Sequence, residues 1–309
     1  MPLVYCILMK NVDWILIIAL GFLWGSSFMF VEVLLQYLDP IFIVFLRVSF
    51  ASVSMLLFIF VSQNSQRLSF KDIFNILIMS LLNNVFPFTF IALGQQTVTG
   101  GLASIINAST AFTSVIVASF FFQTEKLTST RVLGVIIAIF GVASAIGFKN
   151  VFITYESNTG AGLIFLATIF YSFAAVWGKL KLNNLSPIIA ATGMLLASSI
   201  ILLPIILIFR FKQFLLLTPS ISLYAILFAL ISSVLAYLLY FLILKRTGPG
   251  NLLLSTLIIV PFSLLLNKVV MNEIILGQEV VGLLIVSCGL LIIDGRAITF
   301  LKKILRKNI

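Results

Sequence analysis

The chain alternates between long apolar runs and short polar breaks along its whole length. A helix crosses the hydrocarbon core of a bilayer with about 20 apolar residues, and ten runs approach or reach that length. They are residues 12–32, 40–61, 73–95, 100–122, 131–147, 160–180, 187–210, 221–244, 251–270 and 277–294. The breaks carry turn chemistry, as at Asp39-Pro40 and Gly248-Pro249-Gly250. The pattern predicts an all-α integral membrane protein with ten transmembrane helices.

Composition supports the membrane assignment and excludes other classes. The chain is 61% hydrophobic and 9% charged, whereas a soluble domain has about 25% charged residues. A net charge of +10 could indicate a nucleic-acid partner, but the Lys and Arg residues lie in short loops and form no single stripe. Cys6 and Cys288 stand far apart in apolar surroundings and form no disulfide framework. We therefore expect the lipid bilayer as partner and no nucleic acid.

The distribution of basic residues orients the predicted spans. With the N-terminus inside, the outside loops hold only Lys149, Arg210, Lys212 and Lys268, and Arg47 lies within a span; every other Lys and Arg falls inside. Such an excess marks the cytoplasmic side. We expect a multi-pass protein of the cell (inner or plasma) membrane with both termini cytoplasmic. The basic tail, residues 295–309, is expected on anionic headgroups. Met9, which precedes Lys10, is expected to be the true start.

An internal repeat divides the chain into halves. At a shift of 148 residues, Thr99-Gly100 falls on Thr247-Gly248, Glu125 on Glu273, and Gly134 on Gly282. The predicted repeats, 12–147 and 160–294, each contain five spans. An odd number makes the second half enter the membrane from the opposite side, so the halves are inverted copies. Inverted repeats are typical of alternating-access carriers, although duplication kept only for packing would leave the same pattern.

Several motifs resemble one known family. They are Trp24-Gly25-Ser26-Ser27, Arg47, the stretch 81–89 with Gly94-Gln95-Gln96, the stretch 101–108, and Glu125-Lys126-Leu127-Thr128. Together they resemble the EamA family of the drug/metabolite transporter superfamily, over about residues 12–295. The resemblance implies two five-helix repeats around a central cavity and transport of amino acids or related metabolites, often as export. Ala111 stands where the family usually has Pro, which predicts a straighter fourth helix, and Asn272 replaces the usual Gly before Glu273.

Polar residues within the spans are the candidates for a solute site, because they are costly in lipid and mark cavities or helix contacts. In the third span, Asn84, Phe88, Ile91 and Gln95 recur at helical spacing, and Pro87 frees a carbonyl four residues back. Asparagines there could instead join helices. We expect the cavity between spans one, three, four, six, eight and nine. The candidates are Trp24, Ser27, Arg47, Asn83, Asn84, Gln95, Asn107, Thr110, Tyr171, Tyr237, Tyr240 and Ser255.

Two charged residues within spans have alternative interpretations. Arg47 lies about two turns past Pro40 and needs an acceptor. It could bind a substrate carboxylate, pair structurally with an acid, or snorkel towards the interface. Glu32 is the nearest acid along the chain and the candidate for proton coupling.

Two further features have structural interpretations. Glu125 and Glu273 end the fourth and ninth spans at equivalent positions, so an end-capping or loop-locking role is expected for both. Gly134 and Gly141, with Gly282 and Gly289 in the other half, give small-residue faces that pack helix on helix. These faces would also allow a homodimer.

The residue inventory disfavours an enzyme. There is no His, no Cys cluster and no evident carboxylate pair, so neither a catalytic site nor a metal or cofactor site is predicted. A passive channel would favour a continuous polar pore. A lipid-type flippase or a drug efflux carrier of the same fold would also have an apolar, aromatic cavity and stays open. The preferred prediction is a secondary transporter that exports a small metabolite, most consistent with an amino acid; the substrate, direction, coupling ion and oligomeric state are left open.

Overall fold

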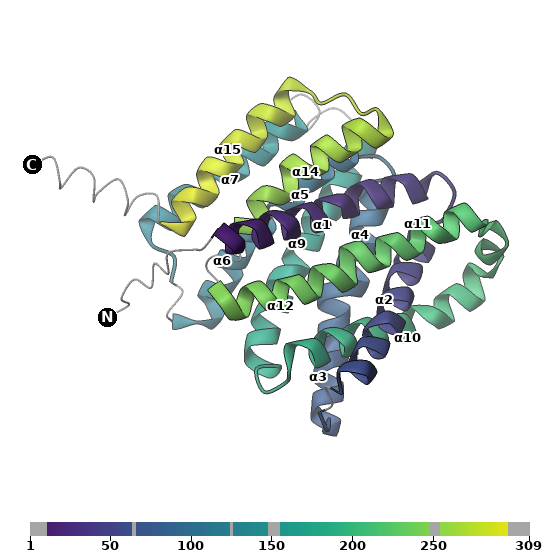
Figure 1. The fold of residues 1–309 in the computed structure, drawn as a ribbon. Coiled ribbons are helices and arrows are strands. Elements are labelled where there is room, and N and C mark those ends of the chain that lie inside the picture. Colours follow the sequence, from purple (N-terminus) through teal and green to yellow (C-terminus); the bar gives the residue numbers. More distant parts are fainter. Residues whose placement is uncertain (1–10, 64–65, 124–125, 148–154, 248–253, 296–309) are drawn as a thin grey trace, which may run out of the picture.

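The computed structural model describes residues 11–63, 66–123, 126–147, 155–247 and 254–295. Within these ranges every regular element is a helix (Figure 1). Nine helical segments there are long and apolar enough to cross a membrane, and a tenth, Ser255–Met271, is shorter. The predicted all-α membrane fold is confirmed. Met9, Glu125, Lys149 and residues 296–309 lie outside the described ranges.

The helices follow the apolar runs closely. In the first half they are α1 (Asn11–Leu35), α2 (Pro40–Ser62), α3 (Phe70–Ser80), η1 (Leu81–Val85), α4 (Phe86–Gly94), α5 (Gly100–Asn107), α6 (Thr110–Phe121) and α7 (Ser129–Ile146). In the second half they are α9 (Tyr155–Lys181), α10 (Pro187–Phe209), η3 (Phe211–Leu216), α11 (Pro219–Ala229), η4 (Leu230–Leu235), α12 (Ala236–Thr247), α14 (Leu254–Met271) and α15 (Gly277–Asp294).

The polar breaks supply the helix caps. The side chain of Asp39 accepts the N–H of Ile41 at the start of α2, where Pro40 needs no hydrogen-bond partner for its nitrogen. Thr99 caps α5 and Thr128 caps α7 in the same way. The residues that mark the breaks in the sequence therefore fix where these spans begin.

The third and eighth spans each contain a π-helical turn in mid-span. These turns are η1 and η4, and after η1 the N–H of Phe86 bonds to the carbonyl of Leu81, five residues back. Pro87 follows directly and has no N–H to continue the α-helical ladder. A π turn inserts one extra residue, which rotates the faces on either side of it. A single uninterrupted helical face from Asn84 to Gln95 was therefore a wrong expectation.

The fourth span is interrupted, which corrects the prediction that Ala111 straightens it. The helix ends at Asn107 and restarts after the turn Ala108–Ser109. The N–H of Ser109 bonds to the carbonyl of Ile106, and that of Ala111 bonds to Ala108, three residues back in each case. The Thr110 hydroxyl also donates to the carbonyl of Asn107 at 2.8 Å. Such back-bonding bends a helix even where no proline is present.

Helices α7 and α15 run side by side at one edge of the molecule (Figure 1). Their glycines face each other: a Cβ on Gly134 would lie 2.8 Å from the carbonyl oxygen of Gly289, and one on Gly141 would lie 3.0 Å from that of Gly282. Close backbone approach of this kind is what small residues permit in membranes. The small-residue faces thus pack helix on helix within the chain, as expected.

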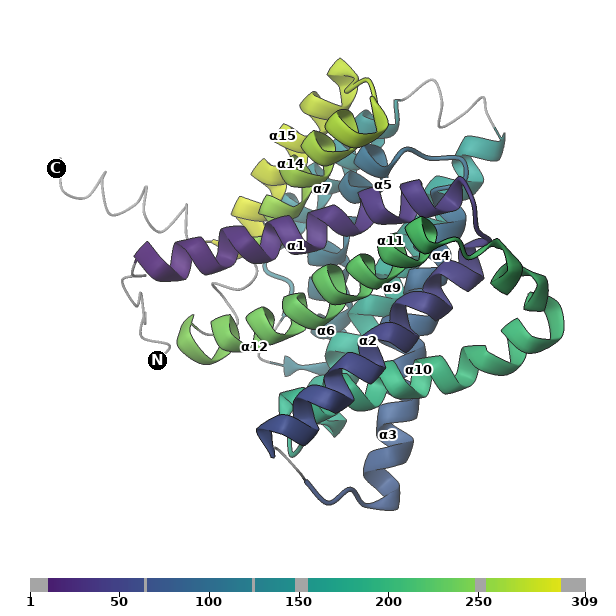
Figure 2. The same cartoon turned by 45° about the vertical axis from the view of Figure 1, so that its right-hand side comes forward.

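Helices α2 and α10 contact each other along their length (Figure 2). The side-chain oxygen of Gln213, after α10, accepts the N–H of Asp39 at 2.9 Å, and that of Gln66, after α2, accepts the N–H of Ser186 at 2.8 Å. Each helix thus begins beside the segment that follows the other, so the pair is antiparallel. The two bonds join positions that correspond at one shift, 147 residues, and therefore tie the two halves reciprocally.

Candidate functional site

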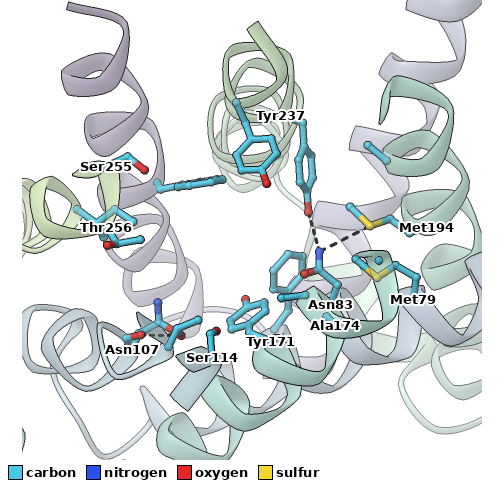
Figure 3. Close-up of a pocket in the computed structure, with 18 of the residues that line it drawn as sticks. Met79, Asn83, Asn107, Ser114, Tyr171, Ala174, Met194, Tyr237, Ser255 and Thr256 are labelled. Carbon is cyan, nitrogen blue, oxygen red and sulfur yellow. Dashed lines mark hydrogen bonds between the residues drawn. The ribbon is translucent and has the colours of Figure 1, made fainter. Parts of the chain in front are cut away.

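A cavity of about 970 Å³ lies between the two halves of the chain. Every spanning segment except α7 and α15 contributes lining residues, and Figure 3 shows side chains from both halves pointing into it. The expected set of six lining spans was therefore incomplete, because α2 contributes Val44 and Arg47, and α10 contributes Ala190 and Met194. Helices α7 and α15 lie outside the ring of helices that lines the cavity.

The cavity opens at one end of the bundle. Its lining includes Lys179 near the end of α9 and Asn183 just beyond it, and both side chains are exposed. We call this the mouth end; α1 begins and α9 and α12 end there. Towards the opposite end the lining residues Phe28, Val31 and Ile91 are all buried. We call this the closed end, where α1 ends and α5 begins.

Asn83 is the central polar group of the cavity wall. Its amide nitrogen donates to the hydroxyl of Tyr237 at 3.3 Å and to the sulfur of Met194 at 3.6 Å (Figure 3). The same nitrogen donates to the side-chain oxygen of Asn84 at 3.3 Å. Asn84 itself is fully buried and donates to the hydroxyl of Ser198 at 3.2 Å. The structure thus places Asn83 on the wall and Asn84 behind it, where it joins two helices and does not line the cavity.

Gln95 also lies away from the cavity, although Phe88 and Ile91 of the same span line it. The Gln95 side chain is buried, and its amide nitrogen donates to the carbonyl of Phe28 at 2.9 Å. It therefore connects α4 to α1. The helical spacing suggested a common face, but spacing does not show whether a neighbouring helix covers one end of it.

Arg47 lines the cavity between two aromatic rings. Its Nε donates to the hydroxyl of Ser233 at 3.0 Å, and Nη2 donates to the carbonyl of Ser232 at 3.3 Å. The guanidinium carbon lies 3.8 Å from the ring centroid of Phe88 and 4.6 Å from that of Phe228. Cation–π contact and hydrogen bonds offset the cost of burying the charge. No acid in the described ranges pairs with it, so the predicted structural ion pair is not found there.

Aromatic side chains form much of the remaining wall. Trp24 contacts Tyr240 with ring centroids 5.8 Å apart, and Tyr237 stacks on Phe241 at 6.4 Å. Tyr171 lines the cavity from α9 (Figure 3). The four aromatic residues proposed from the sequence thus converge on one cavity from three helices. Rings placed this way can stack on a solute or enclose its apolar part.

Small polar groups also line the cavity, and Figure 3 shows Asn107 and Ser255 across it from Asn83. Asn107 and Thr110 flank the break in the fourth span, Ser255 lies on α14, and Ser27 lies on α1. The side-chain oxygen of Asn107 has no hydrogen-bond partner in the described part of the chain. This oxygen atom is itself buried, so a solute would reach it only after the amide turns towards the cavity.

Several lining residues could not be picked out from the sequence. Met79, Met194 and Phe228 line the cavity, but an apolar residue in a membrane span gives no signal that separates a cavity wall from a lipid-facing surface. Lys179 stands at the end of the predicted span 160–180. It lies at the mouth, 4.0 Å from the ring centroid of Phe122.

Glu32 lies outside the cavity, at the closed end. One of its carboxylate oxygens accepts the N–H of Gly100 at 2.6 Å. Glu273 accepts the same N–H at 2.9 Å and that of Gly101 at 3.3 Å. The expected end-capping role of Glu273 is confirmed, since it satisfies the first N–H groups of α5. Its sequence counterpart Glu125 lies outside the described residues.

The charge of the cavity wall is positive. Arg47 and Lys179 are the charged residues among the described lining side chains, and no Asp or Glu is among them. In a cavity with low-dielectric walls such a field is only weakly screened, so it favours a solute that carries negative charge.

Comparison with known proteins gives the family. A sequence model of the EamA-like transporter family matches residues 14–147 and again residues 158–294. An uncharacterized transporter of Archaeoglobus fulgidus is 26% identical over 62% of this chain and 66% of its own length. From Bacillus subtilis strain 168, the uncharacterized transporter YoaV is 21% identical over 89% of this chain and 94% of its own, and YetK is 26% identical over 84% and 77%.

A solved crystal structure superposes on the chain with a TM-score of 0.66. The two share 14% identity, and the superposition covers 92% of this chain and 98% of the other. This likeness supports the fold alone. With the family match over both halves and the apolar helices, it leads to one conclusion: the chain belongs to the EamA-like transporter family and is a multi-pass membrane protein that transports a small solute.

Proposed function

We propose that the protein is a secondary carrier that works by alternating access and moves a small carboxylate-bearing metabolite, an amino acid being the best fit. In this proposal the mouth end faces the cytoplasm, both termini are cytoplasmic, and transport across the cell membrane is outward. The observation that carries the proposal is a cavity between the halves with a positive wall, open at one end and closed at the other.

The arrangement of the halves supports alternating access. Two inverted halves can exchange the open and closed ends by adopting each other's conformation. The family model matches the chain twice, once in each half. The bonds from Gln213 to Asp39 and from Gln66 to Ser186 join equivalent positions at opposite ends of α2 and α10, as such an exchange requires.

Arg47 supports the substrate class. Its described contacts leave the positive charge without an acidic partner, and its side chain faces the cavity. A carboxylate placed in the cavity would neutralise this charge. The side-chain oxygen of Asn107, buried and unpartnered in this conformation, would accept a hydrogen bond from an amino group of the same solute after the amide turns towards the cavity. Together the two side chains match the two polar groups of an amino acid.

The aromatic wall favours a second candidate, a drug efflux carrier or lipid-type flippase of the same fold. Trp24, Tyr237 and Tyr240 would hold a large apolar solute as readily as an amino-acid side chain. The positive field of Arg47 and the hydrogen bonds of Asn83 make a small polar acid the better match.

The proposal is tested by counterflow in proteoliposomes loaded with unlabelled amino acids, one at a time. A carrier accumulates labelled amino acid transiently without an energy source, whereas a channel does not. The expected result is saturable counterflow with at least one amino acid. Absence of counterflow with the whole set, together with movement of a labelled lipid or a cationic dye, would transfer the assignment to the second candidate.

Arg47→Lys gives the test of substrate class, because lysine keeps the charge but loses the planar fork of donors. A charge-assisted hydrogen bond contributes about 1.5–3 kcal/mol to binding. The solute concentration that gives half-maximal counterflow should therefore rise by roughly 10- to 150-fold. The matched control is Arg210→Lys, whose Arg pairs with Asp39 at 3.0 Å away from the cavity. If the solute concentration at half-saturation is the same for Arg47→Lys as for the control, a bidentate bond from the Arg47 guanidinium to a carboxylate is ruled out.

A further inference from the structure

The closed end has a cluster of acceptors that the transport proposal does not use. Glu32 on α1 and Glu273 after α14 both accept the N–H of Gly100, at 2.6 and 2.9 Å. Because both carboxyl groups accept the same N–H, their oxygens lie close to each other. Two ionised carboxylates at this separation repel each other, and neither has a proton to donate to the other.

A third acceptor points to the same place. The side-chain oxygen of Asn267 on α14 has no hydrogen-bond partner in the part of the chain described, and the residue is fully buried. A Cβ built on Gly100 would lie 2.6 Å from this oxygen and 2.6 Å from a carboxylate oxygen of Glu32. The amide oxygen therefore lies beside Gly100, next to the Glu32 carboxyl group.

Donors and acceptors at this point do not balance. Among the described residues, the N–H groups of Gly100 and Gly101 are the donors that reach the carboxyl oxygens of Glu32 and Glu273, and the side-chain oxygen of Asn267 receives no hydrogen bond. The acceptor oxygens outnumber the donors. One added proton supplies a further donor, because a protonated carboxyl group can donate to a neighbouring oxygen. The positive end of the α5 dipole stabilises the carboxylate that remains ionised.

The charged groups around the pair do not supply a counter-ion. Glu279, in the first turn of α15, is buried, adds negative charge near Glu273, and accepts the N–H of Leu276 at 3.0 Å. On α14, Lys268 is exposed. Lys212 in η3 is exposed as well, and Asp39 pairs with Arg210, so that their charges offset each other.

The cluster joins the two halves of the chain at the closed end. Glu32 and Gly100 belong to the first half and Glu273 and Asn267 to the second, so the cluster holds the halves together at the end where the cavity is shut. At a shift of 148, Gly100 and Glu273 have counterparts Gly248 and Glu125, but the segment 176–190 that corresponds to Glu32 holds no acid. The sequence therefore provides a pair of acids at the closed end, and no equivalent pair at the mouth end.

We propose that Glu32, Glu273 and Asn267 form a one-proton latch at the closed end. With one proton shared between the carboxyl groups, the halves stay joined and the cavity opens only at the mouth. Release of that proton to water leaves two adjacent negative charges, whose repulsion separates α1 and α5 from the segment after α14. The inference rests on the proposed carrier function, because it assumes that the closed end opens during transport.

The latch is tested on the full chain without any solute, by spin-label distance measurements across it. Labels go on Gln96→Cys and Ile274→Cys, both exposed positions near Gly100 and Glu273, with Cys6 and Cys288 replaced by Ser. The expected result is one short distance in acid and a growing longer population as the pH rises. Glu32→Gln and Glu273→Gln, each permanently neutral at one carboxyl, should keep the short distance at every pH.

Glu279→Gln is the matched control, since it removes a buried acid beside the pair that does not contact Gly100, and its distances should still depend on pH. Size-exclusion profiles show whether each variant is folded. A pH-independent distance in the parent protein, or pH dependence retained in both Glu32→Gln and Glu273→Gln, would overturn the latch. Counterflow measured in parallel separates the two proposals. Counterflow together with a pH-independent distance would refute the latch alone, whereas absence of counterflow would refute the carrier function.

Discussion

Gly282→Ala should destabilise the protein through the contact between α7 and α15. The added Cβ would lie 2.5 Å from the Cβ of Ala145, 2.7 Å from its nitrogen and 2.7 Å from the carbonyl oxygen of Gly141. Ordinary contacts of a Cβ are longer, so the two helices must move apart by roughly 1 Å. Overpacking of this kind costs about 1–3 kcal/mol, or roughly a 5- to 150-fold change in the unfolding equilibrium.

The control is Gly162→Ala in α9, where an added Cβ meets nothing within 4 Å. That substitution should stabilise by about 0.5–1 kcal/mol, because Ala forms helix better than Gly. Equilibrium unfolding in mixed micelles measures both variants. Adding Ala145→Gly to Gly282→Ala should restore only part of the loss, since the clashes with two backbone atoms remain. Equal stability of Gly282→Ala and the parent protein would refute the close backbone packing.

Three further outcomes are expected. Asn83→Ala should weaken solute binding in counterflow, whereas Asn84→Ala should lower unfolding stability by about 0.6–2 kcal/mol with little change in half-saturation; the reverse assignment would contradict the cavity wall described above. Gly100→Ala should abolish a tightly closed end, because its Cβ meets Glu32 and Asn267 at 2.6 Å, and spin-label distances across the latch should lengthen at all pH values. Gln66→Ala and Gln213→Ala should shift the balance between the two open states in opposite directions, as measured by labelling of a cavity cysteine, and shifts of the same sign would contradict their reciprocal roles.

The sequence predicted the helices well because each has a simple physical signal. Apolar runs of span length and caps such as Asp39 and Thr99 fix where helices begin, and the exposed apolar side chains of Phe60 and Ile208 fit a lipid-facing surface. Most candidate site residues also line one cavity, because polar and aromatic residues are scarce in spans and gather where lipid is excluded. The family resemblance accounts for the central cavity in that prediction.

The departures have local causes that periodicity does not encode. The π turn η1 places Asn83 on the cavity wall and its neighbour Asn84 behind it, and hydroxyl back-bonding breaks the fourth span despite Ala111. The meeting of Glu32 with Glu273 joins residues more than 200 positions apart, which no local pattern shows. For the same reason the contact of Arg47 with Ser233 became visible only in the folded chain.

The most direct test of the carrier is whether its cavity is reached from both sides of the membrane. Ser27→Cys places a thiol on the cavity wall, half-buried in the middle of α1, with Cys6 and Cys288 replaced by Ser. A membrane-impermeant maleimide is applied to right-side-out and to inside-out vesicles. Alternating access predicts labelling in both preparations, with solute raising one rate and lowering the other. Labelling from one side only, with and without solute, would contradict it.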